Sequence, residues 1–184
     1  MLCKIDLQRH FSILVSAYEN SLDIKRIRKN NKKLKDLPLG EFIMKTTEII
    51  LKPIGIIRSP YKTKGDAPRQ GRLVQTLGTV KIFPEFSEGL KDIEKRKHVV
   101  LIYWLHQANR EILLTPTPDV PIPQGVFSIR SPNRPNPIGL GVVELVERKG
   151  NSLTVRGIDA IDGTPLIDIK PYIPKLDEVS YSDN

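Results

Sequence analysis

Val99-Val-Leu-Ile-Tyr-Trp104 sets the fold class of this chain, because valine, isoleucine and aromatic residues in a short run are typical of a β-strand. Runs of the same kind recur along the chain, at 49–57, 78–83, 125–129, 139–146, 152–158 and 168–169. Proline and glycine turns separate these runs, and no long helical pattern lies between them. The sequence therefore predicts a mostly β fold, a small antiparallel sheet closed or nearly closed into a barrel, with short helices such as one over 85–92.

The first 43 residues differ from this pattern. Apolar residues recur there at three- and four-residue steps, as on one face of a helix, at Leu7, Phe11, Leu14, Val15 and Tyr18. A polar, basic stretch follows from 25 to 35. We therefore expect a basic N-terminal extension over 1–43, helical or disordered, and a β-barrel domain over 44–184. A chain of 184 residues is long enough for one ordinary domain with such an appendage.

Composition and charge narrow the class of protein. The chain is 39% hydrophobic and 27% charged, and no apolar run approaches the roughly 20 residues that cross a bilayer. Cys3 is the only cysteine, which excludes a disulfide framework and a cysteine zinc site. With no recognisable secretory signal, the predicted location is the cytoplasm, without a membrane span. Residues 1–43 hold nine Lys/Arg and five Asp/Glu and residues 44–184 hold twenty and sixteen, so each part contributes +4 to the net charge of +8. This balance permits a phosphate-bearing partner without requiring one.

Arg130-Ser-Pro-Asn-Arg-Pro-Asn-Pro-Ile-Gly-Leu-Gly141 is the most unusual segment of the chain. Its three prolines each fix φ and remove a backbone donor, which predicts a stiff, irregular loop. Two arginines and two asparagines on that loop would hold their donors in place before a ligand binds. The segment therefore favours recognition of a polar, anionic ligand, and the alternative is a proline-rich surface connection with incidental charge.

Four polar clusters punctuate the predicted strands, at 67–71, 105–107, 130–140 and 159–172. Because strand ends converge at the rim of a barrel, these clusters can form one concave polar site. His106 is the side chain in them most readily tuned for proton transfer near neutral pH, although a histidine at a strand end can equally be structural. Asp162-Gly-Thr-Pro165 also has the composition of a plain turn. His10 and His98 show no ligand spacing with His106, so we expect no metal.

Several common catalytic motifs are missing from the sequence. It contains no GxGxxG after a strand, no P-loop and no Gly-x-Ser-x-Gly elbow. The residues alone therefore lead to a mostly β protein with a polar, arginine-containing pocket for a small ligand, and they do not specify a reaction.

At these clusters the sequence resembles the tRNA methyltransferase O (TsaA-like) family. The resemblance runs from about residue 49 to 174 and is carried by the segments 53–61, 67–71, 105–107, 125–140 and 162–172. It implies a small β-barrel that pairs as a homodimer and uses S-adenosylmethionine to methylate N6 of threonylcarbamoyladenosine at position 37 of tRNA. Longer members of the family carry an additional C-terminal domain.

The resemblance also implies which residues bind S-adenosylmethionine. Carried over position by position, the cofactor contacts fall on Pro68, Arg69, Gln70, His106, Gln107, Arg130, Leu140, Ile161, Asp162, Gly163 and Thr164. The catalytic residue is not specified, and His106, Asp159 and Asp162 are the candidates for accepting the N6 proton. Two other functions stay open: a non-catalytic S-adenosylmethionine-binding module, and an RNA-binding β-barrel whose polar loop grips phosphates.

Overall fold

A computed structural model describes residues 50–178 of the chain. The expected N-terminal extension over 1–43, with its helical pattern, lies outside the described residues, so its boundary with the barrel domain stays a prediction. Within residues 50–178, no helix is long and apolar enough to cross a membrane.

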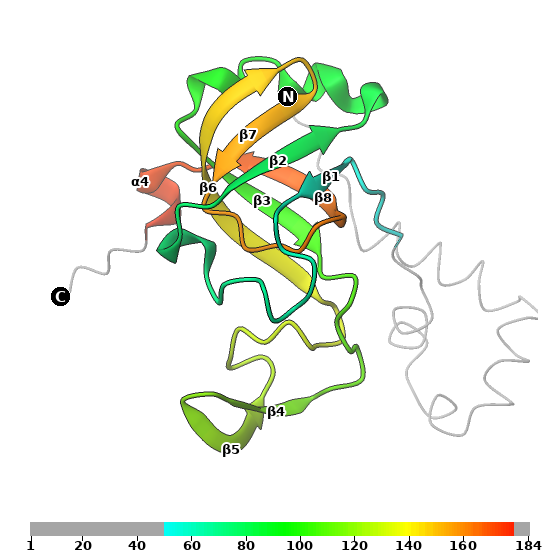
Figure 1. The fold of residues 1–184 in the computed structure, drawn as a ribbon, viewed down its shortest axis with the longest axis vertical. Helices are drawn as coiled ribbons and strands as arrows, with labels where there is room; N and C mark the ends of the chain where they lie inside the picture. The colour runs from blue at the N-terminus through cyan, green and yellow to red at the C-terminus, as the bar shows by residue number, and fades with distance from the viewer. Residues whose placement is uncertain (1–49, 179–184) are drawn as a thin grey trace, which may run out of the picture. The chain divides into compact units, whose positions relative to one another are not determined.

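Six antiparallel strands form a closed barrel, which confirms the predicted fold class (Figure 1). The apolar run at 99–104, on which the predicted fold class was based, lies in strand β3, His98–Trp104. The other barrel strands are β1 (Gly55–Arg58), β2 (Leu77–Ile82), β6 (Ile138–Lys149), β7 (Ser152–Arg156) and β8 (Thr164–Pro171), and their order around the barrel is β1-β2-β7-β6-β3-β8. The helices are short, namely η1 (Gly71–Leu73), η2 (Pro84–Leu90), η3 (Ile93–Lys95) and α4 (Pro174–Asp177). The helix expected over 85–92 corresponds to η2, a 3-10 helix.

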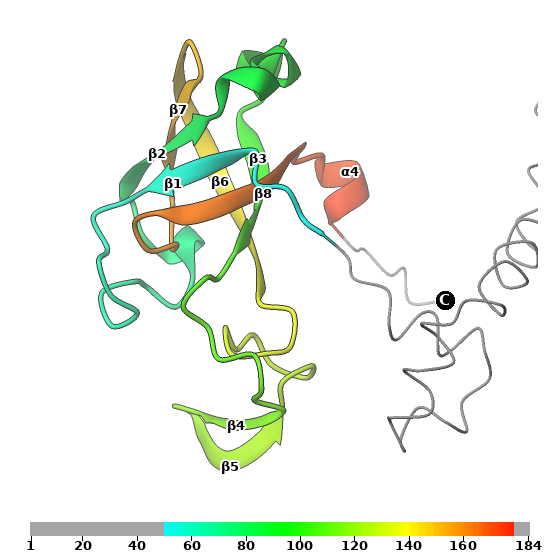
Figure 2. The same cartoon turned by 90° about the vertical axis from the view of Figure 1, so that its right-hand side faces the viewer.

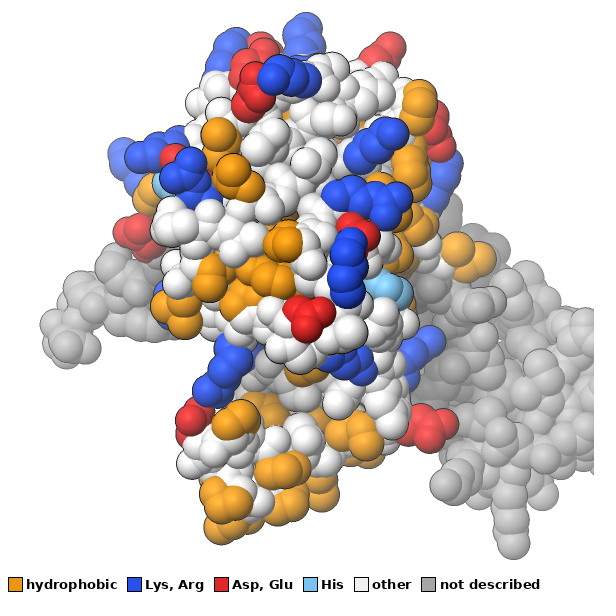
Figure 3. Space-filling view, in the orientation of Figure 1, with side chains coloured by type: hydrophobic (Ala, Val, Ile, Leu, Met, Phe, Trp, Pro, Cys, Tyr) orange, Lys and Arg blue, Asp and Glu red, His pale blue; other side chains and the backbone are white. Residues whose placement is uncertain are grey.

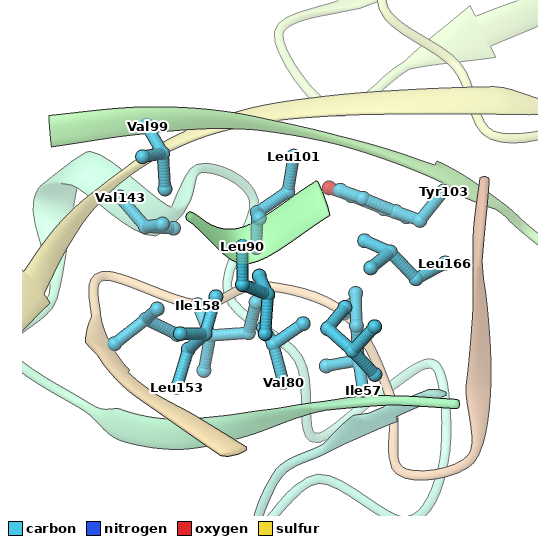
Figure 4. Packing of buried hydrophobic residues seen from close by; sticks show 13 residues of the cluster. Ile57, Val80, Leu90, Val99, Leu101, Tyr103, Val143, Leu153, Ile158 and Leu166 are labelled. Carbon is cyan, nitrogen blue, oxygen red and sulfur yellow. The ribbon is translucent and has the colours of Figure 1, made fainter. Parts of the chain in front are cut away.

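The barrel interior is filled by aliphatic side chains from the strands (Figure 4). Alternate residues point inward, as the period of a β-strand requires, so in β7 Leu153 and Val155 are buried while their neighbours are partly exposed. Ile57, Leu101 and Leu166 are fully buried from three other strands. The barrel is therefore a packed core, and a ligand site belongs at its rims or on its outer surface.

Tyr103 is the large aromatic side chain of this core and lies over a glycine. In the β3–β6 register Tyr103 pairs with Gly139, and a Cβ atom at Gly139 would overlap the tyrosine ring. The ring is only 4% exposed and has little room to move. Gly139 is therefore the residue that lets the two strands enclose an aromatic ring at this point.

Gly139→Ala is expected to lower the free energy of unfolding by about 2 kcal/mol, because the added methyl group overpacks the tyrosine ring. Urea denaturation of the purified protein measures this change. Gly89→Ala in η2 is the matched control, because a Cβ there meets no atom within 4 Å. Equal stability of the two variants would show that the ring can shift without cost.

A second, two-stranded sheet lies outside the barrel, and the sequence prediction missed it. Strands β4 (Leu114–Thr117) and β5 (Val120–Gly125) form a hairpin that extends away from the barrel in Figures 1 and 2. The strands themselves contain three prolines, Pro116, Pro121 and Pro123, a composition that is typical of a loop. Both strands of a two-stranded sheet are edges, and prolines are tolerated there because an edge need not donate a ladder hydrogen bond.

One predicted strand is absent, and the boundaries of two others were wrong. The strand expected over 125–129 is a turn after the last residue of β5, closed by a hydrogen bond from Ser128 N to Gly125 O at 3.0 Å. Pairing in β1 begins at Gly55, although Ile54 N donates to Leu166 O at 2.8 Å. Strand β8 starts at Thr164, earlier than the expected 168–169, because its early residues pair with β1.

Candidate functional site

Asp159 links its own polar cluster to the cluster at 67–71 and to two barrel strands that lie next to the other two clusters. It follows β7 and accepts two hydrogen bonds, from Tyr103 Oη to Oδ1 at 2.6 Å and from Gly71 N to Oδ2 at 2.9 Å. Gly141 of β6 also lies against it, since a Cβ there would be 3.6 Å from Oδ1. One carboxylate therefore ties together the segment that follows Gln70, the end of β3 and the strand that carries Leu140.

The environment of Tyr103 keeps its hydroxyl protonated. Burial raises the pKa of Tyr103 far above its usual value, and the charge of Asp159 and the hydrogen bond to it raise the pKa further. The hydroxyl is thus a fixed donor to Asp159. Sequence reasoning missed this residue as part of the site, although an inward-facing tyrosine needs a partner for its hydroxyl, which is a usable signal.

The loop with Pro68, Arg69 and Gln70 is held in place where the backbone of Gly71 packs directly against the backbone of Gly157. A Cβ on Gly71 would overlap the carbonyl oxygen of Gly157, and Gly157 has a positive φ of 87°. This backbone contact holds the loop close to the end of β7. Gln70 is half-buried directly before it.

Arg69 is engaged by a partner that the sequence did not indicate. Its Nη2 atom contacts Asp119 Oδ2 at 2.8 Å, at the tip of the β4–β5 hairpin. The hydrogen bond raises the pKa of Arg69 and lowers the pKa of Asp119. Both side chains are largely exposed, so this ion pair can exchange with a ligand at small cost.

The segment Ile161–Thr164 is a turn bound to the end of β1. Gly163 N donates to Ile57 O at 2.9 Å, and Thr164 Oγ1 donates to Ile161 O at 2.7 Å. Ser59 Oγ donates to Ala160 O at 2.7 Å, which connects this turn to the neighbouring Asp159. The predicted turn is therefore present, and it lies at the same rim of the barrel as the Asp159 contacts.

Asp162 is paired with basic residues of the β1 end. Its Oδ2 accepts a hydrogen bond from Lys62 Nζ at 2.9 Å and lies 3.7 Å from Arg58 Nη1, while Oδ1 accepts from Ser59 N at 3.2 Å. The Lys62 contact is the main reason that the pKa of Asp162 lies below its usual value, and the Ser59 N–H lowers it further. A carboxylate with both oxygens occupied in this way is a poor proton acceptor.

His106 and Gln107 follow β3 and are exposed next to the proline-rich loop. Leu105 N donates to Pro137 O at 2.8 Å, and Asn109 N donates to Asn133 Oδ1 at 2.9 Å. These bonds bring the β3 end and the loop with Arg130 into contact. The side chain of Leu140, on β6 just after the loop, is 59% exposed.

The two arginines of the loop have different roles. Arg134 donates to three carbonyl oxygens, those of Ser131 at 2.8 Å, Val126 at 2.8 Å and Ile129 at 2.6 Å. It therefore organises its own loop, contrary to the expectation that both guanidinium groups await a ligand. Arg130 is exposed, and its guanidinium forms no ion pair or side-chain hydrogen bond with any residue of 50–178.

The predicted residues thus gather on one rim of the barrel, as an open surface. Two hollows of about 530 and 390 Å³ are lined by other residues. The larger is at the opposite rim, between η2, η3 and the end of β8. This rim is the candidate site, because the ends of the strands and loops that carry the motif residues meet there. In the described part of the chain, no group of three His, Cys, Asp or Glu side chains could hold a metal ion.

Comparisons with known proteins agree on one family. The family model of the tRNA-methyltransferase O N-terminal domain matches residues 56–178. Two proteins of Archaeoglobus fulgidus are similar: one named an S-adenosyl-L-methionine-binding protein is 49% identical over 132 residues (72% of this chain, 95% of that protein), and one named a probable S-adenosyl-L-methionine-binding protein is 54% identical over 129 residues (70% and 35%). The crystal structure of TrmO from Pseudomonas aeruginosa superposes with a TM-score of 0.63 at 37% identity, covering 75% of this chain and 62% of that one. The chain thus spans only about a third of one of these relatives and under two thirds of the solved structure.

Proposed function

Because the chain belongs to the family of tRNA-methyltransferase O N-terminal domains, we propose that it methylates N6 of threonylcarbamoyladenosine at position 37 of tRNA, with S-adenosylmethionine as methyl donor. The observation that carries this proposal is the convergence of its polar segments, through the carboxylate of Asp159, on one rim of the barrel. The S-adenosylmethionine-binding names of the two archaeal relatives support the cofactor. The proposed reaction places the protein in the cytoplasm with tRNA.

The residues on this rim fit the cofactor. The guanidinium of Arg130 suits its carboxylate, because a planar fork of donors can bind both carboxylate oxygens. The exposed side chain of Leu140 offers apolar surface, and Gln107 offers an amide that can donate and accept hydrogen bonds. The family contacts at Pro68–Gln70 and Ile161–Thr164 complete the proposed set, with Arg69 exchanging its bond to Asp119 for the ligand.

When bound, S-adenosylmethionine supplies an electrophilic methyl group, so the residues of the chain need to orient the acceptor nitrogen and remove its proton. Transfer of that methyl group to N6 would release the N6 proton, so a residue of this chain needs to lie where it can accept the proton. Of the three candidates, Asp159 and Asp162 already accept hydrogen bonds on both oxygens. We assign the proton to His106, which is exposed and makes no hydrogen bond within residues 50–178.

We also propose that the chain pairs as a homodimer. Large apolar side chains are exposed on the β4–β5 hairpin, where Leu114 is 66% and Ile122 is 72% exposed, and Figure 3 shows hydrophobic side chains gathered there. Exposed apolar surface of this kind is typical of a protein–protein contact. Sedimentation equilibrium of the full chain tests the pairing, and a monomer at all concentrations would contradict it.

Two assays test the proposed function against its alternatives. Calorimetry with S-adenosylmethionine excludes a plain RNA-binding barrel if the cofactor binds, and contradicts the proposal if it does not. Mass spectrometry of nucleosides after incubation with cofactor and tRNA containing threonylcarbamoyladenosine then separates an enzyme from a non-catalytic cofactor-binding module. A methylated nucleoside absent from cells that lack the gene, and restored by the gene, would complete the case.

Arg130→Ala is expected to weaken S-adenosylmethionine binding by about thirtyfold, since it removes one charge-assisted contact with the carboxylate. The melting temperature should stay unchanged, because this exposed side chain bonds to nothing in the described part of the chain. Calorimetry and thermal unfolding measure the two quantities. Arg96→Ala, an exposed arginine near the larger hollow, is the control and should change neither. Unchanged affinity with a lowered melting temperature would make Arg130 structural.

A further inference from the structure

The smaller hollow, of about 390 Å³, lies outside the residues assigned above. Strands β6, β7 and β3 and the loop after Gly71 line it, and its polar side chains are Arg72, Gln75, His98, Glu144, Arg156 and Tyr172. A volume of this size suits one nucleotide-sized group. The arrangement of its charges and rings indicates what that group is.

Three charged or titratable residues form a row across neighbouring strands. In the barrel register, Glu144 pairs with His98 on one side and with Arg156 on the other. Paired residues project from the same face of a sheet, so these side chains stand next to one another on the outer surface. The contact of Arg156 Nε with Glu144 Oε2 is 3.5 Å, longer than a strong charge-assisted hydrogen bond. Within the described part of the chain, most donors of the Arg156 guanidinium have no partner and can bind an anion.

A second arginine, Arg72, lines the same hollow. Arg72 directly follows Gly71, whose backbone contact with Gly157 holds this loop in place. Its exposed side chain forms no ion pair and no hydrogen bond within residues 50–178. Two guanidinium groups against one carboxylate give the hollow a net positive charge, which favours a phosphate over a neutral ligand.

Aromatic and apolar groups line the rest of the hollow. The rings of His98 and Tyr172 meet edge to face, with centroids 6.3 Å apart, and Tyr172 N donates to His98 O at 3.2 Å. Val74 and Val142 add apolar surface. An aromatic ring beside arginines is the combination that binds unpaired bases and their phosphates in RNA.

We propose that this hollow binds a phosphate and the adjoining base of an RNA strand that extends from the candidate site. The inference rests on the proposed tRNA substrate. The contact between Gly71 and Gly157 connects the candidate site with the hollow. Gly71 N donates a hydrogen bond to Asp159 of the candidate site, and Gly157 and Arg72 line the hollow. A strand held with one nucleotide at the reactive rim can therefore place a neighbouring nucleotide here.

The test is the salt dependence of tRNA binding, measured by fluorescence anisotropy with labelled tRNA that contains threonylcarbamoyladenosine. Arg72→Ala and Arg156→Ala should each weaken binding about tenfold at low salt and reduce the slope of log K against log salt by about 1. Glu144→Gln should have the opposite effect and tighten tRNA binding about threefold, because it removes the carboxylate that pairs with Arg156. Arg96→Ala is the matched control and should leave the slope unchanged. S-adenosylmethionine affinity, measured by calorimetry, should be the same in all four variants.

Variants of Tyr172 test whether an aromatic ring of the hollow stacks on a base of the RNA. Tyr172→Ala should weaken tRNA binding about tenfold with an unchanged salt slope, and Tyr172→Phe should bind like the wild type. If wild-type protein binds tRNA but the two arginine variants keep its salt slope, the inference is wrong and the proposed function survives. If the wild type binds the cofactor but no tRNA, both fail. If inorganic phosphate alone gives calorimetric binding that Arg156→Ala abolishes, while Arg156→Ala binds tRNA like the wild type, the hollow is a small-anion site and the RNA assignment is overturned.

Discussion

Asp159→Ala is expected to lower the free energy of unfolding by about 3 kcal/mol, the largest stability effect that we predict for a residue of the rim. The substitution leaves two donors without their acceptor, the buried hydroxyl of Tyr103 and the N–H of Gly71. Unsatisfied buried donors are costly because they have lost water and gained nothing in return. Urea denaturation measures the loss.

Two further variants separate this structural role from proton transfer by Asp159. The double variant Asp159→Ala with Tyr103→Phe should lose less free energy of unfolding than the sum of the losses in the two single variants. Both substitutions remove the same hydrogen bond, so its loss is counted only once in the double variant. Asp159→Asn keeps an acceptor for Gly71 and should fold with a smaller loss. If Asp159→Asn has near wild-type stability and cofactor affinity but no methyl transfer, Asp159 is the base and our assignment of the proton to His106 is wrong.

Leu140→Arg is expected to weaken S-adenosylmethionine binding more than a hundredfold, on the order of 3 kcal/mol, and tRNA binding little. The substitution places a charged group where an apolar part of the cofactor would lie, and the cofactor is itself a cation. The fold should persist, because the Leu140 side chain is 59% exposed on β6. Calorimetry with the cofactor and anisotropy with tRNA measure the two affinities.

Leu140→Met provides the matched control for this experiment, since it keeps an apolar side chain of similar volume and should retain cofactor binding. Loss of tRNA binding with intact cofactor binding in Leu140→Arg would assign this surface to the RNA. In that case Arg130 and Leu140 would serve different ligands.

Local sequence patterns were sufficient to predict the barrel. Each barrel strand overlaps one of the predicted runs, because valine and isoleucine at alternate positions fill a core wherever the strand lies. The β4–β5 hairpin was missed because Pro116, Pro121 and Pro123 are tolerated only at edges, and edges are a property of the assembled sheet. The Val-Phe-Ser-Ile129 run failed because Arg134 binds the carbonyl oxygens of Val126 and Ile129, which a strand would need for its ladder.

The meeting of the polar segments at one rim of the barrel was predictable from the sequence, while the contacts between these segments were not. Asp159 lies 88 residues from Gly71 and 56 from Tyr103, and no local pattern reports such pairings. The pairing of Arg69 with Asp119 depends on the hairpin that the prediction omitted. Arg130 and Arg134 differ in role because only the Arg134 guanidinium faces backbone carbonyl oxygens of the described residues. Which arginine does so depends on the path of the loop, and this path is not evident from the sequence.

The proline content of the β4–β5 hairpin has a consequence for how the protein behaves at high concentration. An exposed β-hairpin with apolar faces is normally a template on which other chains add strands and aggregate. Pro116, Pro121 and Pro123 have no N–H to offer an incoming strand, so the edges of this hairpin resist sheet extension. The hairpin can therefore expose Leu114 and Ile122 while its edges disfavour the strand addition from which a fibril grows.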